Sequence, residues 1–249
     1  MPGAPPLYSA FMRLQDIPYQ VDGQEMVGYL AVDDERPGPR PSVLICHEGF
    51  GLSDGIRGRA IRLASLGYLA FALDYLGGGR PREDAMSVLG PLMEDRPRIK
   101  RIARAGYEVM VGQDQADASR VAVIGYCFGG TMAFELARDG LDVKAVVGFH
   151  AGPPAPALDE TRTVRAKVLF CLGAADPIIP ADRRHAFEAE LAEAGVEDWR
   201  IELYGGVGHS FTNPKADERA MPGLKYHADA DRRSWRSLLG LLEEVFGPV

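Results

Sequence analysis

The pattern of hydrophobic positions changes along the chain from a two-residue period to short apolar runs that alternate with amphipathic segments. Residues 17–21 and 24–32 alternate apolar and polar side chains around Asp22 and Gly23, a dipeptide that suits a tight hairpin turn because it tolerates positive φ angles. After a polar, Pro-containing linker at 33–41, residues 43–46 form a continuous apolar run of the kind found in buried strands. The pattern therefore predicts an antiparallel hairpin followed by a first buried strand.

From residue 43 onward, strand-like runs alternate with segments of helical periodicity. The strand-like runs are 43–46, 68–74, 120–126, 143–150, 167–173 and 199–205, and the helical segments are 55–66, 98–112, 128–139, 181–194 and 231–246. This alternation is typical of a mostly parallel sheet with helices on both faces. We therefore predict an α/β fold in which residues 17–249 form one domain after a Pro-rich N-terminal extension at 1–16. The irregular segment 77–97 is a candidate for a loop over the functional site.

The segment VAVIGYCFGG at 121–130 places Cys127 among glycines where a predicted strand meets a predicted helix. This is the context of a nucleophile elbow, in which a sharp turn exposes the reactive side chain and small neighbours avoid collisions. The helix N-terminus beneath the sulfur favours the thiolate. An unpaired cysteine in isolation is usually a small buried hydrophobe, and we assign that role to Cys46 and Cys171. For Cys127 the surrounding glycines favour a nucleophile.

Two further residues follow the elbow in the order nucleophile, acid, histidine. Asp176 comes just after the predicted strand at 167–173, and His209 lies in a Gly-rich loop after the strand at 199–205. Alone, Asp176 is compatible with a turn or a helix cap, and His209 with a solvated side chain. Because the carboxyl ends of parallel strands share one edge of a sheet, we expect Cys127, Asp176 and His209 to meet there.

The remaining histidines give weaker signals for a site. His47 adjoins the predicted site in sequence, and His150 ends a strand and is a candidate pocket residue. His185 and His227 have no partner residue nearby in sequence. No HExxH pattern or paired cysteine spacing indicates a metal, and the glycines at 77–79 lack the spacing of a phosphate-binding loop. We expect no metal and no other cofactor.

Composition and cysteine content limit the cellular compartments and the kinds of binding partner that we expect. The net charge is -7, with 46% apolar and 25% charged residues, which is ordinary for a soluble globular protein and unlike a nucleic-acid-binding one. Three scattered cysteines argue against a disulfide scaffold, and no apolar run approaches the ~18 residues that a membrane helix needs. The first residues lack a basic start followed by an apolar stretch. We therefore expect a cytoplasmic monomer or dimer that binds neither nucleic acid nor membrane.

Four segments resemble the dienelactone hydrolase family of α/β-hydrolases, over residues 40–247. They are HEGFGLSDGIRGRAIRLASLGY at 47–68, GYCFGG at 125–130, the aspartate of GAADPIIP at 173–180, and GHSF at 208–211. The resemblance implies that Cys127, His209 and Asp176 form a triad that opens a lactone or ester through a thioester acyl-enzyme. Carboxymethylenebutenolidase-type activity falls within this expectation. The resemblance also implies that Glu48 takes the thiol proton when substrate enters.

The chemistry of acyl transfer gives each of these parts a purpose. A thiol with an ordinary pKa of about 8.5 is mostly protonated at neutral pH, so a neighbouring carboxylate or imidazole must take its proton. His209 can protonate the leaving alkoxide, while Asp176 fixes the tautomer of the imidazole. We expect the backbone N–H groups of Gly49 and Phe128 to receive the oxyanion.

One position departs from the family pattern and bears on the substrate. Asn213 stands where dienelactone hydrolases carry an arginine that binds the substrate carboxylate, which argues against the acidic dienelactone as the substrate. Arg80, Arg82 and Arg98 are alternatives for pairing with an anionic substrate, although the role we expect for them is that of solvated surface charges. The candidate pocket residues are Tyr126, His150, Phe211 and Asn213.

The sequence thus predicts a hydrolase of small esters or lactones and leaves three other functions open. Because a fold does not fix the acyl acceptor, an acyltransferase or a peptidase on the same scaffold is one alternative. A non-catalytic protein that binds a small molecule is another. The third is a redox sensor at Cys127, with Cys46 as the resolving cysteine.

Overall fold

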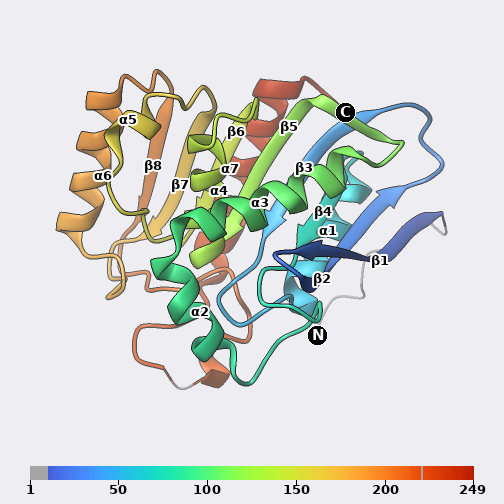
Figure 1. Cartoon of the computed structure of the whole chain (residues 1–249). Helices are drawn as coiled ribbons and strands as arrows, with labels where there is room; N and C mark the ends of the chain where they lie inside the picture. Colours follow the sequence, from blue (N-terminus) through green and yellow to red (C-terminus); the bar gives the residue numbers. More distant parts are fainter. Residues whose placement is uncertain (1–10, 220) are drawn as a thin grey trace.

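An eight-stranded sheet runs through the protein in the order β1-β2-β4-β3-β5-β6-β7-β8 (Figure 1). The structure is a computed structural model that describes residues 11–219 and 221–249. The strands are β1 (Met12–Val21), β2 (Gln24–Asp33), β3 (Arg40–Cys46), β4 (Leu69–Leu73), β5 (Ala116–Tyr126), β6 (Ala145–Phe149), β7 (Lys167–Gly173) and β8 (Trp199–Tyr204). The helices are α1 (Asp54–Ser65), α2 (Ala85–Glu94), α3 (Arg96–Val111), α4 (Phe128–Arg138), α5 (Leu158–Thr161), α6 (Ala181–Ala194), the 3-10 helix η1 (Ala216–Arg219) and α7 (Ala228–Phe246).

The strand directions confirm the predicted architecture. Strands β1 and β2 form an antiparallel hairpin around Asp22 and Gly23, and β2 is also antiparallel to β4. Every other neighbouring pair in the sheet is parallel. The sheet is therefore mostly parallel with an antiparallel hairpin at its N-terminal edge, as expected from the sequence.

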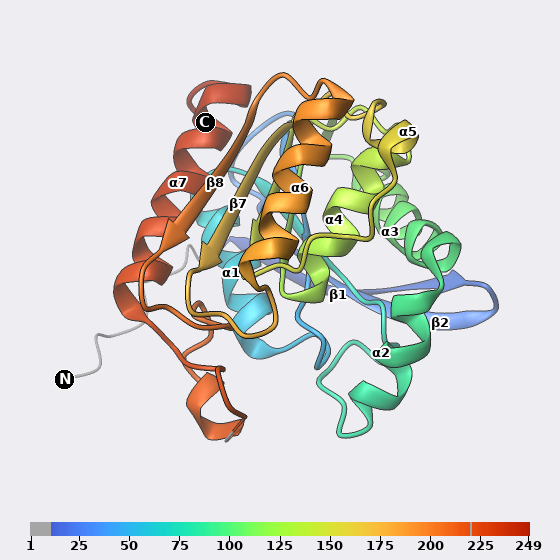
Figure 2. The ribbon, with the colours of Figure 1, turned by 90° about the vertical axis from the view of Figure 1, so that its left-hand side faces the viewer.

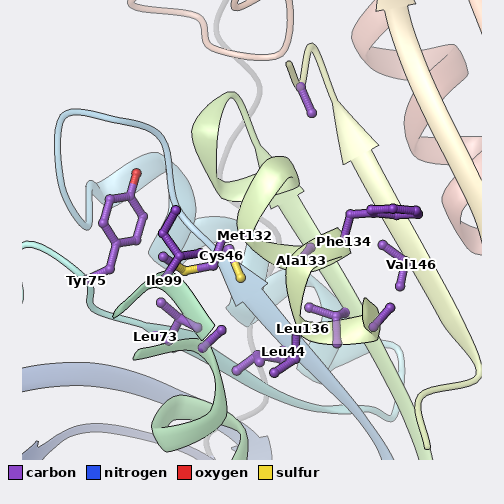
Figure 3. Close-up of a cluster of buried hydrophobic side chains, with 14 of the residues drawn as sticks. Leu44, Cys46, Leu73, Tyr75, Ile99, Met132, Ala133, Phe134, Leu136 and Val146 are labelled. Carbon is purple, nitrogen blue, oxygen red and sulfur yellow. The ribbon is translucent and has the colours of Figure 1, made fainter. Parts of the chain in front are cut away.

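Helices cover both faces of the sheet, and successive strand residues pack on opposite faces. In β3, Leu44 and Cys46 belong to one buried cluster with side chains of α3, α4 and α6, while Val43 and Ile45 belong to a second cluster with α1 and α7. Figure 3 shows Cys46 beside Met132 and Leu44 beside Leu136 of α4 in the first cluster. Helices α6 and α7 lie on opposite sides of β7 and β8 (Figure 2). Burial on both faces explains why the parallel strands read as continuous apolar runs.

The structure differs from the sequence-based expectation at β1 and in the segment 77–97. Strand β1 begins at Met12, so residues 12–16 of the expected extension belong to the sheet; residues 1–10 lie outside the described residues. Strand β1 is an edge strand in which only Val21 is buried, so the hydrophobic pattern in its sequence is weak. The segment 77–97, expected to be irregular, contains helix α2. Pro91 within that helix interrupts the helical pattern in the sequence.

The carboxyl ends of the parallel strands share one edge of the sheet, and chain segments that follow β3, β5, β7 and β8 converge there (Figure 1). Helix α2 and the loop between β8 and α7 lie beyond the same edge (Figure 2). Within residues 11–219 and 221–249, every helix is too short or too polar to cross a membrane.

Candidate active site

Cys127 occupies a sharp turn between β5 and α4 with a strained backbone. Its φ of 54° and ψ of -124° lie in a backbone region that residues other than glycine rarely adopt. A Cβ added at Gly125 would lie 2.1 Å from the carbonyl oxygen of Gly129, and one added at Gly129 would lie 2.2 Å from that of Cys46. The glycines of the GYCFGG motif are therefore required by close backbone contacts, and they set the Cys127 sulfur at the N-terminus of α4.

The structure brings Cys127, His209 and Asp176 together. The Cys127 Sγ lies 3.2 Å from His209 Nε2, and His209 Nδ1 lies 2.7 Å from Asp176 Oδ2. The second carboxylate oxygen of Asp176 accepts a hydrogen bond from the backbone N–H of Ile178 at 2.8 Å. Because each group contacts the next, a proton can pass between the sulfur and the imidazole while the carboxylate orients the ring.

The loop that carries His209 is fixed by backbone contacts. The backbone N–H of His209 donates to the carbonyl of Gly223 at 2.8 Å, and its own carbonyl accepts from Lys225 at 3.1 Å. Burial alone would lower the pKa of His209, but the hydrogen bonds with Asp176 and Cys127 outweigh it and raise the pKa to about 10. The site therefore favours the imidazolium form when the sulfur is a thiolate.

Glu48 lies two residues after the end of β3 and lines the same pocket as Cys127. Its carboxylate is buried, and its Oε2 accepts a hydrogen bond from Asn213 Nδ2 at 2.9 Å. Burial raises the pKa of Glu48, and the hydrogen bond from Asn213 offsets part of that effect. Asn213, which stands at the position of the family's arginine, thus forms a hydrogen bond with Glu48.

The pocket above Cys127, which we term the Cys127 pocket, has a volume of about 190 Å³ and a mostly apolar wall. Helix α2 contributes Met86, Leu89 and Met93, and Gly49 and Phe128, the two expected oxyanion donors, also line it. The pocket rim carries exposed apolar side chains, with Met86 57% and Met93 53% exposed. The sequence analysis did not identify the α2 residues, because their helix fell within the segment expected to be irregular.

The four expected pocket residues do not line the Cys127 pocket. Tyr126 and Asn213 line a separate pocket beside α1. His150 and Phe211 are buried behind His209, with 5.1 Å between the ring centroids of His150 and His209. Tyr126 ends β5 and belongs, with Ala122 and Ile124 of the same strand, to the buried cluster on the α1 and α7 face, which directs it away from the Cys127 pocket.

The arginines suggested as partners of an anionic substrate also lie elsewhere. Arg82 pairs with Asp84, and Arg98 donates to Gln24. Neither these two nor Arg80 lines the Cys127 pocket, whereas Arg183 of α6 does. The Nη2 of Arg183 donates to the carbonyl of Pro153 at 2.9 Å, which leaves this guanidinium at the rim.

The other two cysteines lie in the core, as expected. Cys46 and Cys171 are fully buried, and burial raises the pKa of both thiols. Among the described residues, no group of three or more His, Cys, Asp or Glu side chains could hold a metal ion.

A mostly parallel sheet with a strained strand–turn–helix at Cys127 after β5, Asp176 after β7 and His209 after β8 has the arrangement of an α/β-hydrolase. The sequence pattern of the dienelactone hydrolase family matches residues 26–246. The chain belongs to this family, and by family it is a hydrolase of esters and lactones.

Solved structures and a curated relative agree with this assignment. The chain is 42% identical to m3DLH, with a TM-score of 0.88 over 95% of this chain and 100% of that chain. It is 36% identical to P91, a dienelactone hydrolase-like promiscuous phosphotriesterase from metagenomic libraries, with a TM-score of 0.91 over 96% of this chain and 100% of that chain. The protein named "Putative carboxymethylenebutenolidase" in Escherichia coli strain K12 is 27% identical over 267 residues, covering 99% of this chain and 95% of its own length.

Proposed function

We propose that the protein hydrolyses small, neutral carboxylic esters or lactones, with Cys127 as the nucleophile. The observation that carries the proposal is the chain of two contacts, 3.2 Å from Cys127 Sγ to His209 Nε2 and 2.7 Å from His209 Nδ1 to Asp176 Oδ2. A strained turn that exposes Cys127 above a helix N-terminus supports the same role.

The first half of the reaction forms a thioester. His209 takes the thiol proton, and the Cys127 thiolate attacks the carbonyl carbon of the substrate. The N–H groups of Gly49 and Phe128 stabilise the oxyanion of the tetrahedral intermediate. When the intermediate collapses, the C–O bond to the leaving group breaks and His209 gives its proton to the alkoxide.

Water completes the cycle in the second half. His209 takes a proton from a water molecule as the water attacks the thioester carbonyl, and the second tetrahedral intermediate releases the acid and the Cys127 thiolate. Asp176 stabilises the imidazolium in both halves. Glu48, buried in the wall of the same pocket, serves as a further acceptor for the thiol proton when substrate enters.

The pocket supports neutral, apolar substrates within this class. Its wall is mostly apolar, and the position of the family's carboxylate-binding arginine is occupied by Asn213, whose amide donates to Glu48. An uncharged amide cannot form the bidentate ion pair that a guanidinium makes with a carboxylate.

The proposal is tested with p-nitrophenyl acetate and γ-butyrolactone on the wild type, Cys127→Ala and Cys171→Ala. We expect Cys127→Ala to lose at least about 10³-fold in kcat, because the chemistry proceeds through the missing sulfur. Cys171→Ala is the matched control, since that cysteine is buried in β7 away from the pocket. Turnover that survives in Cys127→Ala would overturn the assigned nucleophile.

Two further measurements separate the alternatives. Adding an alcohol or amine acceptor distinguishes a hydrolase from an acyltransferase, because a transferase yields mainly the acylated acceptor. Iodoacetamide labelling distinguishes an enzyme from a binding protein. If Cys127 reacts no faster than a model thiol from about pH 5 to about pH 9, the thiol is not activated and the binding function gains support.

A second candidate activity is hydrolysis of neutral phosphotriesters. The similarity to P91, a promiscuous phosphotriesterase by its title, favours it, together with the apolar pocket around Cys127. A dialkyl aryl phosphate should then be hydrolysed by the wild type and not by Cys127→Ala. Release of the aryl alcohol at equal rates from both proteins would exclude this activity at Cys127.

A further inference from the structure

A second pocket of about 250 Å³ lies beside helix α1 and has Glu48 in common with the Cys127 pocket. We term it the Tyr126 pocket. Its wall comes from Ser53 and one side of α1 as far as Arg62, from Tyr126 at the end of β5 and from residues 212–214 after His209. The mechanism described above uses none of these wall residues except Glu48.

The hydroxyl of Tyr126 is a buried polar group without a partner. Tyr126 is 2% exposed, and its hydroxyl makes no hydrogen bond to any other described residue. The charged groups that influence the hydroxyl are Arg59, Arg62, Glu48 and Asp231, and the first three line the pocket. The hydroxyl therefore lies among charged groups of the pocket wall, and because buried polar groups are almost always hydrogen-bonded, its lack of a partner points to a ligand with a polar group.

Arg59 has hydrogen-bond donors that are available to such a ligand. In the described part of the chain, Arg59 donates through Nη2 alone, to the carbonyl of Thr212 at 3.0 Å and to Asp231 Oδ1 at 2.7 Å. Its Nε and Nη1 donors are left for another acceptor. The Arg62 guanidinium also lines the pocket, with its carbon 4.1 Å from the centroid of the Trp235 ring.

The remaining charges leave the pocket suited to an anion. Asp231 compensates part of the Arg59 charge, and Arg62 lies in the same wall. Glu48 is the acidic group in the wall, and its Oε2 already accepts a hydrogen bond from Asn213 Nδ2 at 2.9 Å. The N-terminal turn of the twelve-residue helix α1 adds a favourable partial charge.

A glycine in α1 keeps the pocket open. Gly58 is helical, and a Cβ added there would meet no atom within 4 Å, so neither close packing nor backbone conformation requires a glycine at this position. Glycine is less favourable than alanine inside a helix. The missing side chain therefore leaves usable space in the pocket rather than relieving a collision.

We propose that the Tyr126 pocket binds a small organic carboxylate with an apolar ring or short chain. The carboxylate accepts hydrogen bonds from Arg59 and from the Tyr126 hydroxyl, and the apolar part packs on Ile56 and Pro214. A guanidinium is well matched to a carboxylate because its planar fork can donate two parallel hydrogen bonds. The site does not depend on the proposed hydrolase activity, since its binding groups are separate from Cys127, His209 and Asp176.

Isothermal titration calorimetry with benzoate tests the proposal on the wild type and on two pocket variants. Tyr126→Phe removes only the hydroxyl, and Gly58→Ala places a methyl group in the pocket while favouring the helix. We expect one benzoate per chain, a Kd that rises about tenfold or more in each variant, and binding of neutral benzamide weaker than benzoate by a similar factor. Met93→Gln is the matched control, because Met93 lines only the Cys127 pocket, and its benzoate Kd should be unchanged.

Three results would overturn the proposal. The first is the absence of benzoate binding at millimolar concentrations. The second is equal affinity for benzoate and benzamide, which would remove the role of the arginines. The third is a Kd that changes in Met93→Gln but not in Gly58→Ala and Tyr126→Phe, which would place benzoate in the Cys127 pocket. Circular dichroism and unfolding midpoints establish that the variants are folded.

Discussion

The ring Nδ1 of His47 lies 2.6 Å from the carbonyl oxygen of Glu48. The backbone N–H of Tyr75 donates to the other ring nitrogen at 3.4 Å, so Nδ1 carries the hydrogen and donates to the carbonyl. That carbonyl and the N–H of Gly49 belong to one trans peptide unit and point in opposite directions. The His47 contact therefore orients the proposed oxyanion donor, and the ring is itself held by stacking on Tyr75, with 3.8 Å between centroids.

Replacing His47 should slow ester acylation more than it changes thiol reactivity. In His47→Leu the Glu48 carbonyl keeps only the longer hydrogen bond from the Gly51 N–H, at 3.2 Å, so the peptide is held less firmly and the Gly49 N–H meets the oxyanion less well. Because loss of one oxyanion donor typically costs about 10²–10³-fold in rate, we expect kcat for p-nitrophenyl acetate to fall at least about tenfold. The measurement is the rate of the acylation burst in stopped flow.

Two controls separate this positioning role from general damage. Alkylation of Cys127 by iodoacetamide forms no oxyanion, so its rate should stay near the wild-type value in His47→Leu. His47→Asn keeps a donor close to the position of Nδ1 and should restore part of the acylation rate. Parallel losses in acylation and alkylation would show that His47 only maintains the fold.

The elbow glycines should be far less replaceable than a glycine in an open helical position. In Gly129→Ala the new Cβ would lie 2.2 Å from the Cys46 carbonyl oxygen, a backbone atom that cannot move aside. We expect a loss of about 2–3 kcal/mol in the free energy of unfolding, measured by urea denaturation. Gly90→Ala in α2 is the control, because its Cβ would meet no atom within 4 Å, and it should be neutral or stabilising by up to about 1 kcal/mol. Equal destabilisation by both substitutions would contradict this interpretation.

The positions of Cys127, Asp176 and His209 were predictable because they depend on strand order and strand ends. A parallel strand must end at the same edge as its neighbours, so a residue just after a strand can be placed without knowing any side-chain contact. The structure brings these three side chains within hydrogen-bonding distance in the expected sequence of contacts. Their local motifs contain enough glycine to reveal the turns.

The pocket wall was not predictable from the same rules. Side chains alternate between the two faces of a strand, so a shift of one residue at the end of β5 decides which face Tyr126 occupies. In the structure Tyr126 lies on the α1 side, away from the Cys127 pocket. The sequence analysis missed the wall residues Met86 and Met93. They belong to helix α2, which contains Pro91, so the helical periodicity of this segment was not recognisable in the sequence. Long-range packing, which local patterns do not encode, decides both outcomes.

Protonation of His209 should make stability depend on pH in a defined window. The folded pKa of about 10 exceeds the ordinary value of 6.5, so the folded state binds the proton more tightly than the unfolded state. The resulting stabilisation is fully present below about pH 6.5 and is lost as the pH rises toward about 10. We expect the difference in urea midpoint between the wild type and His209→Gln to be largest near pH 6.5 and to shrink at higher pH. A difference that stays constant across this range would exclude a raised pKa at His209.

The exposed methionines of α2 should favour longer acyl chains. Met86 and Met93 line the Cys127 pocket and keep more than half of their surface exposed, 57% and 53%, so a ligand can bury apolar area that solvent now reaches. Burying one methylene contributes about 0.8 kcal/mol, or roughly fourfold in affinity. We therefore expect kcat/KM for p-nitrophenyl butyrate to exceed that for the acetate by about tenfold.

A charge at the rim should cancel this preference without harming the chemistry. In Met93→Glu the carboxylate replaces apolar surface, so the ratio of kcat/KM for butyrate to acetate should fall toward one while acetate hydrolysis changes little. Leu203→Glu is the matched control, because Leu203 on β8 is 51% exposed and lies outside the pocket wall. If both variants keep the wild-type ratio, the methionines do not contact the acyl chain. If both lose it, the effect comes from net charge, and the apolar rim plays no part in the choice of substrate.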